Sequence, residues 1–255
     1  MKKIYAVLNL IVVVTVIIWN YVSNTGKING KTIGEVSDKI DNLFTPADYA
    51  FAIWGVIFLG LIANAIYQLR VAYGNDESKQ RDVLTGPWLI IANIANGTWI
   101  YCWLNDYTGL SVLVMIVILL SLIRITFLLR LENHTPSREV IMLSWWPNTI
   151  YFGWISVALI ANISAYFAKI GWADNVNEVN YTIGMVIVAT IVNLAVLYTR
   201  NMREFCLVGI WSLIAIAMRS EISSIYYTAL ICAGLLAVLT MLHAMKNYKQ
   251  NSLLW

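Results

Sequence analysis

Tryptophan and asparagine side chains within long apolar segments are the groups in this sequence best suited to binding chemistry. At about 100° per helical residue, Trp88, Asn96, Trp99 and Trp103 fall within one narrow arc of the segment 88–104. Flat aromatic rings bind planar apolar ligands by stacking. The arc therefore predicts a surface that can hold a flat, apolar ligand.

Two other apolar segments have similar faces. Between residues 141 and 168, Tyr151, Trp154, Ala158 and Asn162 share one face of a helix. Polar side chains inside a membrane usually point toward the protein interior, so Asn96 and Asn162 should bring their tryptophans inward. The third face, between residues 49 and 69, is formed by Phe51, Trp54, Phe58, Leu61 and Ala65.

Helix packing is the alternative explanation for these faces, and the pattern by itself favours it. Asparagines form hydrogen bonds between membrane helices, and tryptophans fill the space between them. Tryptophans near the ends of apolar segments also act as interface anchors. We expect that role for Trp19, Trp88, Trp172 and Trp255.

The sequence lacks the spacings expected of an enzyme or a metal site. His134 and His243 have no carboxylate or cysteine partner at metal-ligand spacing, and there is no G-x-S-x-G, HExxH or glycine-rich phosphate loop. The cysteines Cys102, Cys206 and Cys232 form no CxxC pair and are expected to be buried hydrophobes. We therefore expect no catalytic residue, no metal and no tightly bound cofactor.

The composition is that of a membrane protein. Hydrophobic residues make up 60% of the 255 residues and charged residues 12%, with a mean hydropathy of +0.69. A soluble domain averages about 25% charged residues, so lipid suits this surface better than water. No basic run indicates nucleic acid as a partner.

We predict an all-α integral membrane protein with eight spans, since a helix needs about 20 mostly apolar residues to cross the hydrocarbon. Most of the 17 Lys and Arg residues then lie on the side of the N-terminus. The positive-inside rule therefore places both termini in the cytoplasm, with a bacterial cytoplasmic membrane as the expected location. The predicted spans are Tyr5–Val22, Tyr49–Leu69, Trp88–Leu104, Gly109–Leu129, Ile141–Ala168, Tyr181–Thr199, Phe205–Met218 and Ser224–Ala244.

Three stretches of the sequence resemble motifs of the TspO/MBR family, the tryptophan-rich sensory and translocator proteins. Residues 151–162, YFGWISVALIAN, are similar to the family segment P-Y-L-x-W-x-x-F-A-x-x-L-N, with Ile150 in place of its proline. Residues 96–99, NGTW, resemble L-N-x-x-W. The stretch from Thr45 through Phe58 resembles the family's F-x-x-V-W-x-x-x-Y segment, with Phe51 one residue nearer to the tryptophan.

The resemblance implies a five-helix bundle over residues 1–168, with three additional transmembrane helices over residues 169–255. It also implies an outer loop, here residues 23–45, over a cavity that binds porphyrins or other apolar ligands, and bundles that are often homodimers. Together, the faces and the resemblance predict a ligand-binding site of Trp54, Phe58, Asn96, Trp99, Trp103, Tyr151, Trp154, Ala158 and Asn162.

These observations favour a membrane receptor or carrier for a tetrapyrrole-like or other apolar aromatic ligand, with a stress-sensing or regulatory role. A secondary transporter for a small organic solute is the alternative, although no inverted internal repeat is visible. An enzyme that degrades the ligand is the third hypothesis, but the sequence offers no acid–base pair for it.

Overall fold

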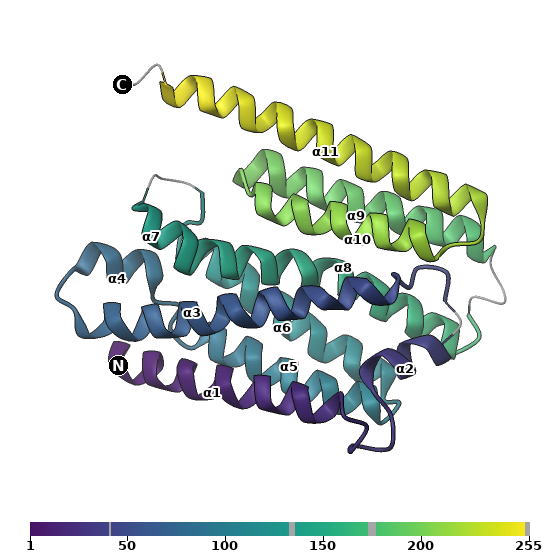
Figure 1. The fold of residues 1–255 in the computed structure, drawn as a ribbon, viewed down its shortest axis with the longest axis horizontal. Coiled ribbons are helices and arrows are strands. Elements are labelled where there is room, and N and C mark those ends of the chain that lie inside the picture. The colour runs from purple at the N-terminus through teal and green to yellow at the C-terminus, as the bar shows by residue number, and fades with distance from the viewer. Residues whose placement is uncertain (41, 133–135, 173–176, 253–255) are drawn as a thin grey trace.

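A computed structural model describes residues 1–40, 42–132, 136–172 and 177–252, which leaves His134 and Trp255 outside the described residues. Within these ranges the chain is helical and contains no strand (Figure 1). The long helices are α1 (Lys2–Ser23), α3 (Ile53–Tyr73), α5 (Trp88–Leu104), α6 (Thr108–Leu128), α8 (Trp146–Lys169), α9 (Glu178–Arg200), α10 (Arg203–Arg219) and α11 (Ser223–Ser252). The short elements are α2 (Ile33–Lys39), the 3-10 helix η1 (Asp48–Ala52), α4 (Glu77–Val83), α7 (Arg138–Val140) and the π-helical turn η2 (Ile141–Trp145).

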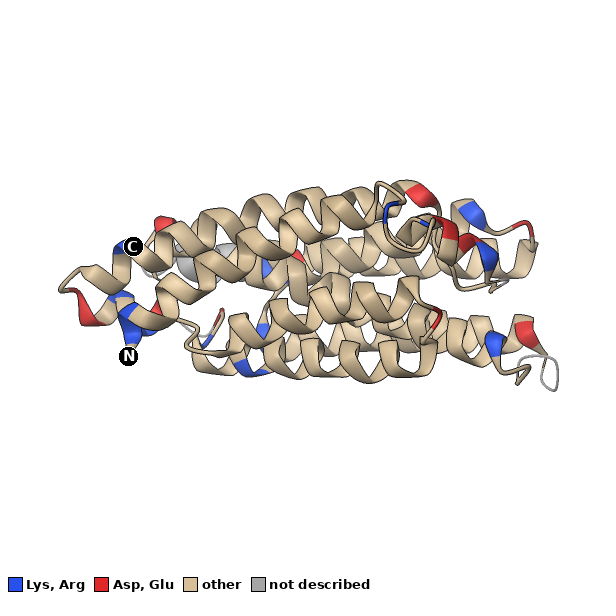
Figure 2. Ribbon diagram, turned by 90° about the horizontal axis from the view of Figure 1, so that it is seen from below, with Lys and Arg blue, Asp and Glu red and all other residues tan. Residues whose placement is uncertain are grey.

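Within the described residues, six helical stretches are long and apolar enough to cross a membrane, which confirms an integral membrane protein. Charged residues lie mainly toward the two ends of the helices (Figure 2). A helix lies at each of the eight predicted spans, but α5 and α10 have only 17 residues each, so their crossing remains a prediction. The six stretches are Lys2–Ser23, Asp48–Tyr73, Thr108–Leu128, Arg138–Lys169, Glu178–Arg200 and Ser223–Lys246.

The first five long helices form a closed ring. Helix α5 packs between α1 and α6, helix α8 packs against α6 and α3, and α3 returns to α1. One cluster of buried apolar side chains fills this ring and includes Leu61, Ile100 and Met115. Each helix turns an apolar face inward and leaves an equally apolar face, such as Leu59 and Leu113, exposed. That second face suits lipid as the surrounding solvent.

Helix α8 is preceded by an irregular turn, where the sequence places Pro147 after two tryptophans. Proline has no N–H to donate to the carbonyl four residues earlier, which here belongs to Leu143. The π-helical turn η2 precedes the proline, and the Asn64 side chain donates a hydrogen bond of 2.9 Å to the Leu143 carbonyl oxygen. Helix α3 lies close enough to form this hydrogen bond because Gly60, which has no side chain, faces Pro147. A Cβ atom added at Gly60 would lie only 3.2 Å from the Cβ of Pro147.

Helices α9, α10 and α11 form a second layer, which α10 joins to the ring by packing against α8 (Figure 1). Helices α8 and α10 can pack this closely because Gly153 on α8 has no side chain. A Cβ atom added there would lie 3.1 Å from Val208 Cβ and 3.2 Å from the Phe205 carbonyl oxygen. A separate cluster of buried apolar residues, including Leu213, Ile225 and Leu236, holds the layer together. The division of the chain near residue 168 remains a prediction.

Gly209→Ala should destabilise this second layer by about 1–3 kcal/mol, the usual cost of overpacking. A methyl group there would overlap the side-chain amide of Asn193, which is buried on α9 and donates to the Ala189 carbonyl oxygen. Thermal unfolding in detergent measures the effect, and Asn193→Ala in the same chain should restore stability. Gly184→Ala is the control, since open space surrounds that helical glycine. Equal tolerance of both alanines would refute the packing.

Candidate functional site

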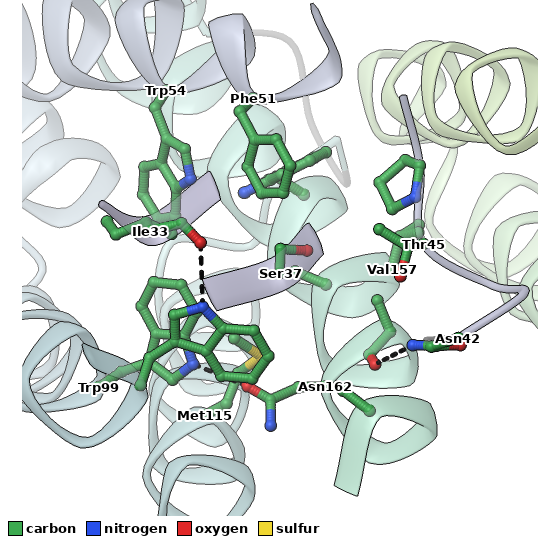
Figure 3. Close-up of a pocket in the computed structure, with 16 residues that line it drawn as sticks. Ile33, Ser37, Asn42, Thr45, Phe51, Trp54, Trp99, Met115, Val157 and Asn162 are labelled. Atoms are coloured by element: carbon green, nitrogen blue, oxygen red, sulfur yellow. Dashed lines mark hydrogen bonds between the residues drawn. The ribbon is translucent and has the colours of Figure 1, made fainter. Parts of the chain in front are cut away.

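An internal cavity of about 50 Å³ lies between α3, α5, α6 and α8, in the half of the ring nearest α2 (Figure 3). Residues 24–40, which include α2, form a cover segment over it, and Ile33 and Ser37 of this segment line the cavity. The remaining lining residues are Asn42, Thr45, Pro46, Phe51, Trp54, Trp99, Trp103, Met115, Trp154, Val157, Ala158, Ala161, Asn162 and Ala165.

Asn162 organises the α5 side of the cavity. Its Oδ1 accepts a hydrogen bond of 2.8 Å from Trp99 Nε1, and its Nδ2 donates one of 2.8 Å to Ser111 Oγ on α6. The Trp99 ring in turn stacks on Trp103, with ring centroids 5.9 Å apart and planes 21° apart. A single buried amide therefore ties three helices together and fixes the orientation of two indoles.

Aromatic rings from α3 and α8 form the opposite wall. Trp54 and Trp154 meet edge to face at 6.4 Å, and Phe51 meets Trp154 at 6.0 Å. The Trp154 side chain is 3% exposed, and its Nε1 has no hydrogen-bond partner among the described residues. Buried indole N–H groups usually find an acceptor, and leaving one unpaired costs about 1–3 kcal/mol. Trp154, a residue that lines the cavity, therefore carries an unused donor.

The cover segment is fastened by polar contacts on the α5 side. Trp103 Nε1 donates to the Ile33 carbonyl oxygen at 3.2 Å, and Lys31 forms an ion pair of 2.9 Å with Asp106. Helix α2 itself starts with a capping box, in which the Thr32 backbone N–H lowers the pKa of the Glu35 carboxyl. Asn29 adds a hydrogen bond of 3.0 Å to the carbonyl oxygen of Leu104.

Contacts with the second layer hold the other end of the cover segment. Arg219 at the end of α10 pairs with Asp38 at 2.9 Å and with Asp48 at 3.3 Å. Just after the cover segment, Asn42 Oδ1 accepts a hydrogen bond of 2.7 Å from Ser164 Oγ on α8. These ion pairs are partly exposed, and exposed pairs contribute only about 0–1 kcal/mol each. The cover is therefore positioned by several weak contacts.

The structure brings most of the predicted site together and places the rest one helical turn deeper. Trp54, Trp99, Trp103, Trp154, Ala158 and Asn162 line the cavity. Phe58, Asn96 and Tyr151 do not line it. Phe58 stacks on Trp54 at 5.3 Å, and Asn96 Nδ2 donates a hydrogen bond of 3.1 Å to the Tyr151 hydroxyl. These three residues form a floor that supports the lining rings.

Several lining residues were not predicted. Met115 comes from α6, and Ala161 and Ala165 extend the face of α8 by one more turn. The spacing of Ala158, Ala161 and Ala165 could have indicated a strip of small residues beside the tryptophans. Ser37 lies on the short helix α2 and Asn42 follows it, within a stretch that the sequence pattern predicts only as a loop. The resemblance of the loop to a cavity cover was the only clue to their position.

The site offers stacking surfaces and hydrogen-bond donors rather than titratable groups, since no Asp, Glu, Lys, Arg or His lines this cavity among the described residues. No group of three or more His, Cys, Asp or Glu side chains in the described part of the chain could hold a metal ion. The lining side chains can therefore stack on a planar ring and form hydrogen bonds with it.

Comparison with known proteins identifies the family. A family model described as TSPO-like protein matches residues 6–242, so the match extends beyond the ring of helices through most of the second layer. No curated protein and no solved structure matches the chain. Since the family model covers more than half of the sequence, the chain belongs to the family of TSPO-like proteins.

Proposed function

We propose that this protein is a membrane receptor or carrier that binds a flat, apolar, tetrapyrrole-like ligand among Trp54, Trp99 and Trp154. The unpaired Trp154 N–H is the observation that carries the proposal, together with the cavity that this ring lines. A ligand carboxylate or carbonyl oxygen would accept from this donor, while the ligand ring would lie against the indoles. The proposed ligand thus combines a planar apolar body with a polar acceptor at its edge.

The size of the cavity sets a condition on binding. Small-molecule pockets usually have volumes of roughly 300–1,000 Å³, whereas this cavity has about 50 Å³. The ligand must therefore displace part of the wall. The cover segment is the element to move, because weak polar contacts hold it, whereas Trp99 and Asn162 are fixed in the helical ring.

The proposed membrane arrangement is a TspO-like five-helix bundle formed by α1, α3, α5, α6 and α8, followed by three further spans. In this arrangement α5 and α10 cross the membrane as well, because each packs between longer apolar helices. Both termini would then lie on the cytoplasmic side, as the positive-inside rule favours, and the cover segment would face outward.

Trp154→Phe tests the proposed donor, because it keeps a six-membered aromatic ring and removes the N–H together with the five-membered ring that carries it. We expect the affinity for protoporphyrin IX to fall about two- to tenfold, the value of one hydrogen bond. Stability without ligand should change little, since the loss of an unsatisfied donor offsets the space left by the smaller buried ring. Absorbance titration in nanodiscs, with empty nanodiscs as the baseline, measures the affinity.

Trp146→Phe serves as the matched control, because Trp146 is 39% exposed and lies outside the cavity. Its affinity should equal that of the unmodified protein. If both variants bind protoporphyrin IX as tightly as the unmodified protein, the ligand does not use the Trp154 donor. If the unmodified protein binds no more porphyrin than empty nanodiscs do, the proposed function is wrong.

A further inference from the structure

A second cavity lies at the opposite end of the helical ring, where the N-terminus is. It has a volume of about 1080 Å³ and is bounded by the starts of α1 and α5, by α4 and by the end of α6. The cationic side chains that line it are Lys2, Arg81 and Arg130, against one carboxylate, Asp82, among the described lining residues. We call this cavity the basic cleft.

Two guanidinium groups in the basic cleft are free to bind an anion. The side chains of Arg81 and Arg130 are exposed and form no ion pair or hydrogen bond with another described residue. Lys2 Nζ is held by a hydrogen bond of 2.9 Å to Gln80 Oε1 on α4, which fixes one wall. Arginine presents a planar fork of donors that matches phosphate oxygens, so phosphate is the anion these groups recognise best.

The basic cleft lies where one apolar helical stretch begins and another ends. The apolar stretch of α1 begins at Lys2, and that of α6 ends at Leu128. Leu128 lines the cleft and is 40% exposed, so the same cleft also has an apolar wall. Trp88, an aromatic residue of the kind found at membrane interfaces, lines the cleft and lies 6.0 Å from the Arg124 guanidinium.

We propose that the basic cleft binds the phosphate headgroup of an anionic phospholipid. Free cations at the membrane surface attract anionic lipids, and an adjacent apolar wall accommodates the start of an acyl chain. A soluble phosphate compound would bind the same guanidinium groups. Its affinity would not increase through apolar contact with Leu128 or with the lipid-facing side of α6. The site is independent of the tryptophan-lined cavity, which lies at the other end of the helices.

Native mass spectrometry of the delipidated full-length protein tests the proposal with two lipids, dioleoyl phosphatidylglycerol and dioleoyl phosphatidylcholine. The unmodified protein should bind its first phosphatidylglycerol at least about fivefold more tightly than phosphatidylcholine. Arg81→Gln combined with Arg130→Gln should remove this preference, and each single variant should reduce it. Arg138→Gln is the matched control, because it removes one exposed charge at the same end of the molecule, outside the cleft.

The lipid proposal fails if the double variant keeps the full preference, or if Arg138→Gln lowers it as much as either single variant does. It also fails if inorganic phosphate displaces phosphatidylglycerol at equal concentration, since the site would then be one for soluble phosphate. Unfolding temperatures in pure phosphatidylcholine nanodiscs should be equal for all variants. If the double variant is not folded, the two single variants decide between these outcomes.

Discussion

Replacing Ala158 with leucine should abolish binding of protoporphyrin IX while the protein remains folded. Ala158 lines the tryptophan cavity on α8, beside Trp154 and Asn162. A leucine side chain at this position extends into the cavity of about 50 Å³ and takes the position of the ligand edge between the indoles. Because the cavity is empty at this point, the substitution fills space, and its overpacking cost should stay below about 1–3 kcal/mol.

The test of Ala158→Leu combines a porphyrin titration with thermal unfolding of the same nanodisc samples. Ala195→Leu is the control, since Ala195 lies on α9 and is exposed toward lipid. The control should bind like the unmodified protein. Unchanged porphyrin affinity in a folded Ala158→Leu protein would place the ligand elsewhere on the molecule.

Replacing Asn162 with leucine should destabilise the protein and weaken ligand binding together. The change leaves the buried Trp99 N–H without its acceptor and removes the donor to Ser111. An unsatisfied buried donor costs about 1–3 kcal/mol, although hydrogen bonds between membrane helices average only about 0.6 kcal/mol. We expect the free energy of unfolding to fall by about 1–3 kcal/mol, since the Asn162 amide forms hydrogen bonds with both Trp99 and Ser111.

A double-mutant cycle separates the hydrogen bond from the general effect of the substitution. Trp99→Phe removes the donor of this hydrogen bond. Asn162→Leu should therefore lower the free energy of unfolding clearly less in the Trp99→Phe background than in the unmodified protein. Ser111→Ala should have a smaller effect than Asn162→Leu, because Trp99 then keeps its acceptor. Additive effects of Trp99→Phe and Asn162→Leu would show that the two side chains are not coupled.

Helical periodicity predicted which face of each helix points inward, because the angle between side chains is fixed by the sequence spacing. Trp154, Ala158 and Asn162 recur about every four residues, and all three reach the cavity. Periodicity carries no information about depth along the helix axis. Tyr151 shares the face of Trp154 but lies one turn farther from the cover segment, and so belongs to the floor.

The cover segment could not be built from the sequence. Its position depends on partners that are distant in the chain, such as Lys31 with Asp106 and Asp38 with Arg219. No local pattern links these residues, because the pairs form only after the helices have assembled. The same holds for the approach of α10 to α8, which depends on the absence of a side chain at Gly153.

The most direct test of a ligand site among the tryptophans is a structure of the protein with protoporphyrin IX in a nanodisc. The proposed function predicts planar density between Trp54, Trp99 and Trp154, an acceptor oxygen within about 3 Å of Trp154 Nε1, and a displaced cover segment. Density elsewhere, such as in the groove between α1 and α5 near Gly97, with the tryptophan cavity still closed, would contradict it.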